Sequence, residues 1–257
     1  MEKFPAKTGW LWVKQGFALF RKQPAEMSTL FMAYMFTMLV TGLIPVLGQV
    51  MPLFLVPLFS IGFLQACFNI EHGTRVFPNI LLTGFRSKSR NRLLQLGGLY
   101  LIAAIVAVGA SAIIDGGVFW QTMSGQTALD VETVRDSNMS LAMIFAAAVY
   151  TPVAMAFWYA APLIVWQKMS VSKAVFYSFF AVHRQGRAFL VYGLAWGALG
   201  VLLPLMVSML VAVIFQSALA TMMVLLPLSI LLTVIMYCSF YPTYTHVFGQ
   251  PDVAEMN

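Results

Sequence analysis

The sequence predicts an all-α membrane protein with six transmembrane helices arranged as three hairpins. Hydrophobic residues make up 60% of the 257 residues, charged residues only 9%, and the mean hydropathy is +0.83. Soluble domains carry roughly 25% charged residues, so this composition excludes a water-soluble protein. The apolar runs are continuous over the length of a membrane-spanning helix and do not alternate as in a β-barrel. We therefore expect a single polytopic membrane domain over residues 1–257.

The apolar segments divide into six predicted spans. No Asp, Glu, Lys or Arg occurs between Ala188 and Val247, so this stretch is expected to hold two spans with a turn near Gln216 and Ser217. Prolines are expected to kink the second helix of each hairpin, and they are Pro52 and Pro57, Pro152 and Pro162, and Pro227 and Pro242. The predicted spans are residues 28–44, 49–70, 93–114, 140–166, 188–215 and 218–241.

An amphipathic segment that precedes each hairpin is predicted to form a helix in the membrane interface. In the middle segment, FPNILLTGFRSKSRNRLL at residues 77–94, a helical wheel places apolar side chains opposite Arg86 and Arg90. Thr8 and Ser172 are candidate N-caps of the other two helices. The three interfacial segments are residues 1–27, which Pro24 separates from the first span, 71–92 and 167–187. The predicted apolar face of the third consists of Val175, Phe176, Phe179, Phe180 and Val182.

The order of interfacial segment, basic cluster and hairpin occurs three times, in blocks 1–70, 71–166 and 167–257. This order indicates a threefold internal repeat, although basic amphipathic loops are also an ordinary property of membrane hairpins. Fourteen of the fifteen Lys and Arg residues lie in the three interfacial segments, and the remaining one is Arg135. The positive-inside rule therefore predicts that these segments and both termini are cytoplasmic.

Basic residues beside apolar helices attract anionic lipid headgroups, and each cation near the surface contributes about 1 kcal/mol to the binding free energy. The alternative is that these charges only set the topology. The net charge of +6 does not indicate nucleic-acid binding, because the cations flank apolar segments. The candidate headgroup-binding residues are Arg21, Lys22, Arg86, Lys88, Arg90, Arg92, Arg184 and Arg187.

The sequence contains no spacing typical of a catalytic or metal-binding motif, so it predicts neither an enzyme nor a bound cofactor. Cys67 and Cys238 are expected to be free thiols that fill the core. A metal or haem site remains an alternative if the hairpins pack in a ring, because three histidines fall near the cytoplasmic interface. These are His72, His183 and His246.

Two further features bear on packing and transport. Gly193 and Gly197 form a GxxxG motif that Gly200 extends, which predicts close helix packing within the chain or against a partner. The acids Glu26, Glu71 and Asp115 fall at helix ends, and the lack of a predicted mid-membrane acid argues against an ion-coupled transporter. Hydroxyl groups near the midplane leave a neutral path open, and they are Thr37, Thr41, Ser111, Ser208 and Thr233.

Two stretches resemble a group of uncharacterised six-helix proteobacterial inner-membrane proteins. They are residues 84–94, and PLIV at 162–165 followed by SKAVFYSFF at 172–180. The resemblance implies a bacterial inner membrane and no established catalytic residues. We expect a non-enzymatic protein that acts through anionic lipids or a membrane-protein partner, as an accessory, assembly or scaffold factor of a membrane complex. The alternative is a transporter or channel for a small neutral or lipid-like substrate.

Overall fold

The computed structural model describes residues 3–44, 47–123 and 138–251, and every regular element within them is helical. Five helical stretches are long and apolar enough to cross a membrane, and they are Val50–Glu71, Arg90–Asp115, Met139–Val165, Gly186–Phe215 and Ala218–Phe248. The elements are α1 Lys7–Lys22, α2 Pro24–Gly42, α3 Leu47–Glu71, the 3₁₀ helix η1 Pro78–Leu82, α4 Thr83–Arg86, α5 Arg90–Asp115, α6 Val118–Met123, α8 Met139–Phe157, α9 Ala160–Val165, α10 Val171–Arg184, α11 Gly186–Gly197, the π-helix η2 Ala198–Leu202, α12 Leu203–Phe215 and α13 Ala218–Phe248.

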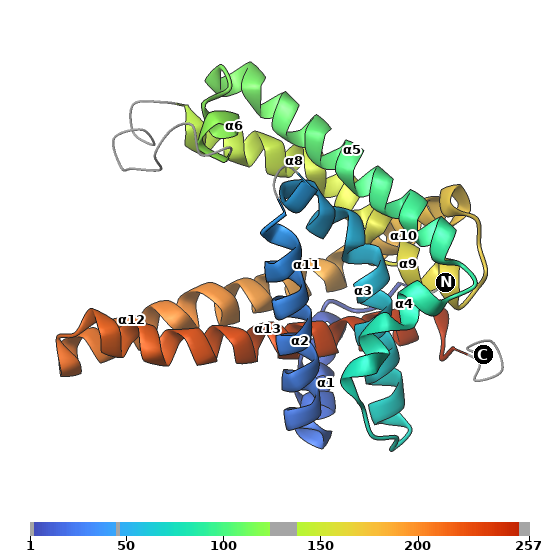
Figure 1. Ribbon diagram of the computed structural model, residues 1–257, viewed down its shortest axis with the longest axis horizontal. Helices are drawn as coiled ribbons and strands as arrows, with labels where there is room; N and C mark the ends of the chain where they lie inside the picture. The colour runs from blue at the N-terminus through green and yellow to red at the C-terminus, as the bar shows by residue number, and fades with distance from the viewer. Residues whose placement is uncertain (1–2, 45–46, 124–137, 252–257) are drawn as a thin grey trace.

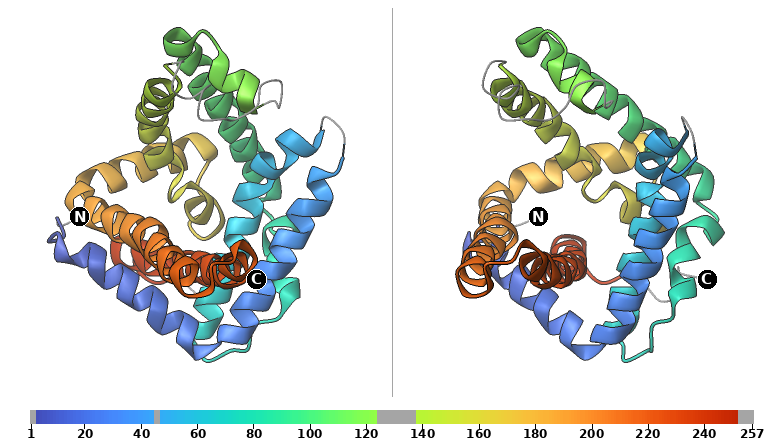
Figure 2. Two further views of the ribbon diagram at one scale, coloured as in Figure 1. Left: turned by 90° about the vertical axis from the view of Figure 1, so that its left-hand side faces the viewer. Right: turned by 60° about the vertical axis from the view of Figure 1, so that its left-hand side comes forward.

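Three helical hairpins diverge from a shared base (Figures 1 and 2). They consist of α2 with α3, α5 with α8, and the α11–α12 helix with α13. Left-handed residues end the helices at two of the outer tips, since Gly116 has φ 65° and Gln216 has φ 46°. Ser217 then caps α13, because its hydroxyl accepts a hydrogen bond from the Ala220 amide at 3.4 Å. The turn expected near Gln216 and Ser217 is confirmed.

The hydrophobic core lies at the base, where the inner ends of the hairpins meet the interfacial helices. Met27 and Leu30 of α2, Leu93 of α5 and Leu163 of α9 are fully buried there. The outer parts of the hairpins instead expose large apolar side chains, such as Val213, which is 76% exposed. Apolar exposure of this extent is what a lipid-facing surface requires.

Each interfacial element packs on a hairpin at the base. Helix α1 lies against α11 and α13, η1 and α4 lie against α3, and α10 lies against α8 and α9. Two of these contacts depend on glycine, because a Cβ at Gly9 would collide with the Ala188 carbonyl and one at Gly84 with the Leu58 carbonyl. The close approach explains why these positions carry no side chain.

The middle interfacial segment is not the continuous helix predicted over residues 77–94. It forms η1 and α4, and the chain then becomes extended at Ser87, with φ −62° and ψ 141°, before α5 begins at Arg90. The predicted N-caps were also wrong. Thr8 lies inside α1, whose N-cap is Ala6, and Ser172 lies inside α10, whose N-cap is Ser170.

Three differences between the predicted and the observed spans occur at prolines. Helix α2 begins at Pro24 rather than residue 28, because proline is well tolerated in the first turn of a helix. The span predicted over 140–166 breaks into α8 and α9 around Trp158 and Tyr159, since Pro162 lacks the amide that would bond the Trp158 carbonyl. Helix α13 continues past Pro242 to Phe248. Pro45, which directly follows the first predicted span, lies outside the described residues.

The buried face of α10 is not its predicted apolar face. The buried residues are Ala174, Ser178, Ala181 and Val182, whereas Phe176 and Phe180 are 61% and 50% exposed. The Ser178 hydroxyl accepts from the Tyr159 amide at 2.9 Å and donates to the Met155 carbonyl at 2.8 Å. Small residues therefore face the protein, and only Val182 of the predicted face is buried.

Candidate functional site

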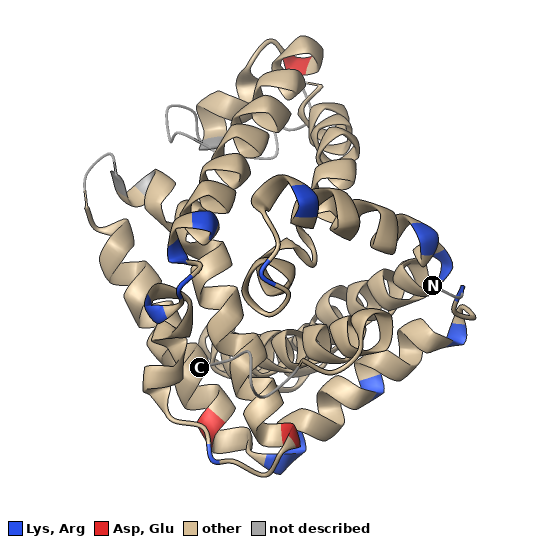
Figure 3. Ribbon diagram, turned by 90° about the vertical axis from the view of Figure 1, so that its right-hand side faces the viewer, with Lys and Arg blue, Asp and Glu red and all other residues tan. Residues whose placement is uncertain are grey.

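A basic cavity of about 500 Å³ lies at the base, between the start of α5 and the turn after α9. Three of its cations are the predicted headgroup candidates Arg86, Lys88 and Arg92, and the fourth is Lys168. No Asp or Glu is among the described residues that line it. Its walls consist of Gln65, Thr83, Arg86, Ser87, Lys88, Ser89, Arg92, Val165, Trp166 and Lys168. Figure 3 shows the Lys and Arg positions around the base, with an acidic position at the far end of one hairpin.

Hydrogen bonds join the two sides of this cavity. The Arg92 guanidinium donates to the Lys168 carbonyl at 3.0 Å and to the Met169 carbonyl at 3.4 Å. The Ser89 hydroxyl donates to the Ile164 carbonyl at 3.4 Å. The extended backbone at Ser87 turns the chain between α4 and α5, so that cations from both helices face one space. The departure from a continuous helix therefore creates the cavity.

Lys168 adopts a left-handed backbone conformation, with φ 53°. This conformation costs an L-residue with a side chain roughly 1–2 kcal/mol. The turn that contains it is closed by hydrogen bonds from the Trp166 amide to the Pro162 carbonyl at 2.8 Å and from the Met169 amide to the Leu163 carbonyl at 3.2 Å. Strain of this kind is often retained where a side chain must be presented in a fixed position.

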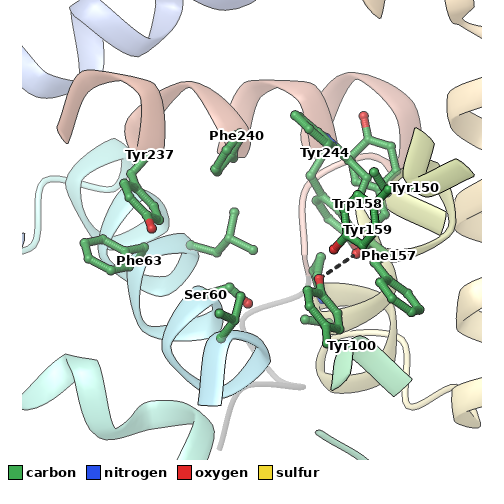
Figure 4. Close-up of a pocket in the computed structure, with 15 residues that line it drawn as sticks. Ser60, Phe63, Tyr100, Tyr150, Phe157, Trp158, Tyr159, Tyr237, Phe240 and Tyr244 are labelled. Atoms are coloured by element: carbon green, nitrogen blue, oxygen red, sulfur yellow. Dashed lines mark hydrogen bonds between the residues drawn. The ribbon is translucent and has the colours of Figure 1, made fainter. Parts of the chain in front are cut away.

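An aromatic cavity of about 250 Å³ lies between α3, α5, α8, α9 and α13 (Figure 4). The Tyr100 hydroxyl donates to the Phe157 carbonyl at 3.5 Å, and the Tyr159 hydroxyl donates to the Thr243 carbonyl at 3.0 Å. These hydroxyls are therefore engaged by the protein backbone. Aromatic rings and aliphatic side chains form most of its wall, with five tyrosines at Tyr100, Tyr150, Tyr159, Tyr237 and Tyr244.

The two cavities are neighbours. On α3, Leu64 lines the aromatic cavity and the next residue, Gln65, lines the basic one. Trp166 on the basic side contacts Tyr244 on the aromatic side, with ring centroids 4.8 Å apart. The Trp166 ring nitrogen is buried and has no hydrogen-bond partner among the described residues. Trp166 and Tyr244 thus form part of the partition between a charged and an apolar space.

The other headgroup candidates lie elsewhere. Lys22 lines a separate cavity of about 160 Å³ together with Glu71 and Tyr241. The Glu71 carboxylate accepts a hydrogen bond from the Tyr241 hydroxyl at 2.6 Å. The candidates that are exposed and line none of these three cavities are Arg21, Arg90, Arg184 and Arg187.

The acids and thiols occupy the positions expected from the sequence. Glu26 pairs with Arg75 at 3.2 Å, at the inner end of α2. Asp115, at the outer end of α5, accepts from the amides of Gly117 and Phe119 at 2.9 Å and 2.7 Å. Both cysteines are buried and free, as predicted, and they are Cys67 and Cys238.

The histidines do not converge on a metal or haem site. The His246 Nδ1 atom accepts from the Trp12 indole at 2.7 Å, whereas the rings of His72 and His183 stack on Phe68 and Phe179. Within the described residues, no group of three His, Cys, Asp or Glu side chains is placed to hold a metal ion. The alternative based on a ring of histidines is therefore wrong.

The glycine stripe, which consists of Gly193, Gly197 and Gly200 on α11 and η2, does not pack against the described residues. A Cβ added at Gly193, Gly197 or Gly200 would meet no atom within 4 Å. Packing within the chain, one of the two predicted alternatives, is not observed among the described residues, because α1 and α13 contact other faces of this helix. Packing against a partner stays a prediction. The neutral path along the midplane hydroxyls stays a prediction. Four of these hydroxyls donate hydrogen bonds to carbonyls of their own helices, and they belong to Thr37, Thr41, Ser111 and Thr233.

Two features of the site were missing from the sequence interpretation. Lys168 belongs to the third block, and only the turn after α9 brings it to the cations of the second block. The tyrosines of the aromatic cavity come from α5, α8, the turn before α9 and α13, so no local spacing relates them. The only signal in the sequence was the aromatic content of 14%.

Among known proteins, the chain is similar to a probable inner membrane protein of Burkholderia thailandensis. The two are 41% identical over 252 residues, which cover 96% of this chain and 93% of the relative. No protein-family model matches the chain, and no solved structure matches it. The similarity extends over all three blocks, and it confirms the resemblance to inner-membrane proteins.

Proposed function

The chain belongs to the family of inner-membrane proteins represented by the Burkholderia protein, and we propose that it binds anionic lipid headgroups in the basic cavity. In this proposal it is a non-enzymatic multi-pass protein of the bacterial inner membrane. Its role is that of an accessory, assembly or scaffold factor whose action depends on a bound lipid.

The convergence of four cations carries this proposal. Arg86, Lys88 and Arg92 come from the second block and Lys168 from the third, yet they line one cavity whose described residues include no acid. A topogenic role requires positive charge on the correct side of the membrane and does not require the charges to share a cavity. The Ser87 hydroxyl in the same wall accepts from the Ser89 amide at 3.1 Å and has its proton left to donate to a phosphate oxygen.

The topology we propose has six spans and cytoplasmic termini. Helix α2 supplies the sixth span, since its 19 residues extend about 28 Å, close to the hydrocarbon thickness. Its exposed Phe36 and Leu39 suit contact with lipid. The described ends of the chain lie on the side of the base, where the cations gather (Figures 1 and 3). Cysteine labelling of sealed cells at positions 3 and 250 tests this arrangement, and labelling from outside would contradict it.

We also propose that the three blocks are structural repeats. The packing of the interfacial elements supports this proposal, because each contacts the hairpin that precedes it in a cyclic order. Thus α4 contacts α3, α10 contacts α8, and α1 contacts α13 of the last hairpin. Such an arrangement closes a ring of three units around an axis along the membrane normal.

Native mass spectrometry of the full chain tests lipid binding. Phosphatidylglycerol is expected to remain bound preferentially over phosphatidylcholine. The double variant Arg86→Gln/Lys88→Gln is expected to reduce the preference by roughly 30-fold, because each cation contributes about 1 kcal/mol to the binding free energy. The matched control Arg184→Gln/Arg187→Gln removes the same charge outside the cavity and is expected to retain the preference. Equal loss in both variants, or no preference in the native protein, would contradict the proposal.

A transporter for a lipid-like substrate is the second candidate. The aromatic cavity supports it, because its wall is formed by helices of different hairpins. The test reconstitutes the protein in proteoliposomes and follows a labelled phospholipid. A transporter is expected to move it across the membrane faster than it crosses the membrane of empty vesicles. An unchanged rate together with intact phosphatidylglycerol binding would favour the accessory role.

A further inference from the structure

We infer that a single anionic phospholipid occupies both cavities, with its phosphate in the basic cavity and one acyl chain in the aromatic cavity. This inference rests on the proposed headgroup binding and adds the position of the chain. Its basis is the shared wall, in which Gln65 follows Leu64 and Trp166 touches Tyr244.

The spacing of the cavities agrees with the dimensions of a lipid. On α5, Arg92 lines the basic cavity and Tyr100 the aromatic one. Eight helical residues separate these positions by about 12 Å along the axis. The headgroup layer on each side of a bilayer is only about 5–8 Å thick, so a point 12 Å from the phosphate lies among the acyl chains.

The chemistry of the walls also matches the two parts of such a molecule. The basic side presents guanidinium, ammonium and hydroxyl groups, whereas the aromatic side presents Phe63, Phe157 and Phe240 with tyrosine rings. The volume of about 250 Å³ is slightly below the range of roughly 300–1,000 Å³ typical of small-molecule sites. A cavity of this size suits one hydrocarbon chain rather than a whole diacyl lipid.

The partition lies between the positions assigned to the phosphate and to the acyl chain. Trp166 is 1% exposed, and its ring meets Tyr241 and Tyr244 edge-on. The Tyr244 hydroxyl accepts from the Gln167 side chain at 3.3 Å, which ties the partition to the turn that presents Lys168. Binding of the phosphate by Lys168 and packing of the chain against Tyr244 therefore act on the same short segment.

The test uses phosphatidylglycerol with a photoreactive diazirine in one acyl chain, in phosphatidylcholine nanodiscs that contain the full chain. Cross-links are expected on residues of the aromatic cavity, such as Ala161 and Tyr237. The same diazirine chain on phosphatidylcholine is expected to label only the outer faces of the hairpins. Excess inorganic phosphate distinguishes the phosphate sources, since complete displacement of the lipid would identify a free-phosphate site and overturn the inference.

The variant Ala154→Phe fills the aromatic cavity from α8 and is expected to abolish cross-links inside it. Ala148→Phe is the matched control, because Ala148 lies on the same helix, is exposed and does not line the cavity. Ser60→Phe fills the cavity from α3 and serves as the second variant. Retained phosphatidylglycerol preference by native mass spectrometry shows that a variant is folded.

The outcomes separate the inference from the proposed function. If phosphatidylglycerol binds preferentially but its chain labels only outer helix faces in the native protein, the inference is overturned and headgroup binding stands. If the native protein shows no headgroup preference, the proposed function fails as well. Chain labelling inside the cavity that Ala154→Phe and Ser60→Phe leave unchanged would also overturn the inference.

Discussion

The base of the molecule and the outer halves of its hairpins both contain many large apolar side chains but are stabilised in different ways. At the base, helices approach closely through glycine, alanine and serine, and polar bonds cross between elements, as at Ser178 and Tyr159. In the outer halves, large side chains such as Val213 and Ile214 are exposed, and hydroxyls bond their own helices. Hydrophobicity therefore indicates insertion, whereas small residues and polar bonds between helices indicate where the protein packs on itself.

The largest expected effect comes from truncating leucines in the two regions. Leu93 is fully buried at the base, whereas Leu210 on α12 is 62% exposed. Leu93→Ala is expected to lower the free energy of unfolding by about 2–5 kcal/mol, because it leaves a cavity. Leu210→Ala is expected to change it by less than about 0.5 kcal/mol. Denaturation in mild detergent measures both, and equal losses would remove the distinction between base and outer halves.

Added volume at glycine should give the next largest contrast. At Gly84, a Cβ collides with the backbone of Leu58, so Gly84→Val is expected to cost about 1–3 kcal/mol and to lower the melting temperature. A Cβ at Gly109 of α5 meets nothing within 4 Å, so Gly109→Val serves as the control. A stable Gly84→Val protein would show that α4 does not pack as closely on α3 as described.

A buried hydroxyl should matter more at the base than in an outer half. Ser178→Ala leaves the Tyr159 amide without its acceptor and is expected to cost about 1–3 kcal/mol. Thr233→Ala removes the hydroxyl of a half-buried side chain that bonds the Ser229 carbonyl of its own helix, so little change is expected. Thermal denaturation followed by circular dichroism compares them, and an equally small effect at Ser178 would contradict the role assigned to its bond.

The same contrast explains how much of the fold could be predicted. Apolar runs located five spans and the turn at Gln216, because insertion depends on local composition. The face of α10 that packs on the protein was not predicted, since the strongest apolar periodicity on an interfacial helix marks the face toward lipid. Phe176 and Phe180 belong to that face. Protein contact instead follows Ala174 and Ala181, whose low hydrophobicity makes a weak signal.

The candidate site was predicted in part for a related reason. Arg86, Lys88 and Arg92 lie close in sequence, so their charge density was visible before the structure. The break at Ser87 carries no proline or glycine, and it was therefore not predicted. Two other features depend on contacts between distant segments, and the sequence therefore did not predict them. They are the presence of Lys168 in the basic cavity and the wall that this cavity shares with the aromatic one.

The smallest effect is expected at the glycine stripe, and it sharpens the comparison most. Gly197→Ala adds a methyl group where no atom of the described residues lies within 4 Å, so the stability of the monomer is expected to change by less than about 0.5 kcal/mol. A GxxxG stripe that contacts lipid alone should also leave the mass of the detergent-solubilised protein unchanged. If size-exclusion chromatography with light scattering instead shows that Gly197→Ala dissociates a larger complex, the outer half of α11 contacts another protein. In that case exposure in the isolated chain would mark an interface, and the outer halves would follow the same packing rule as the base.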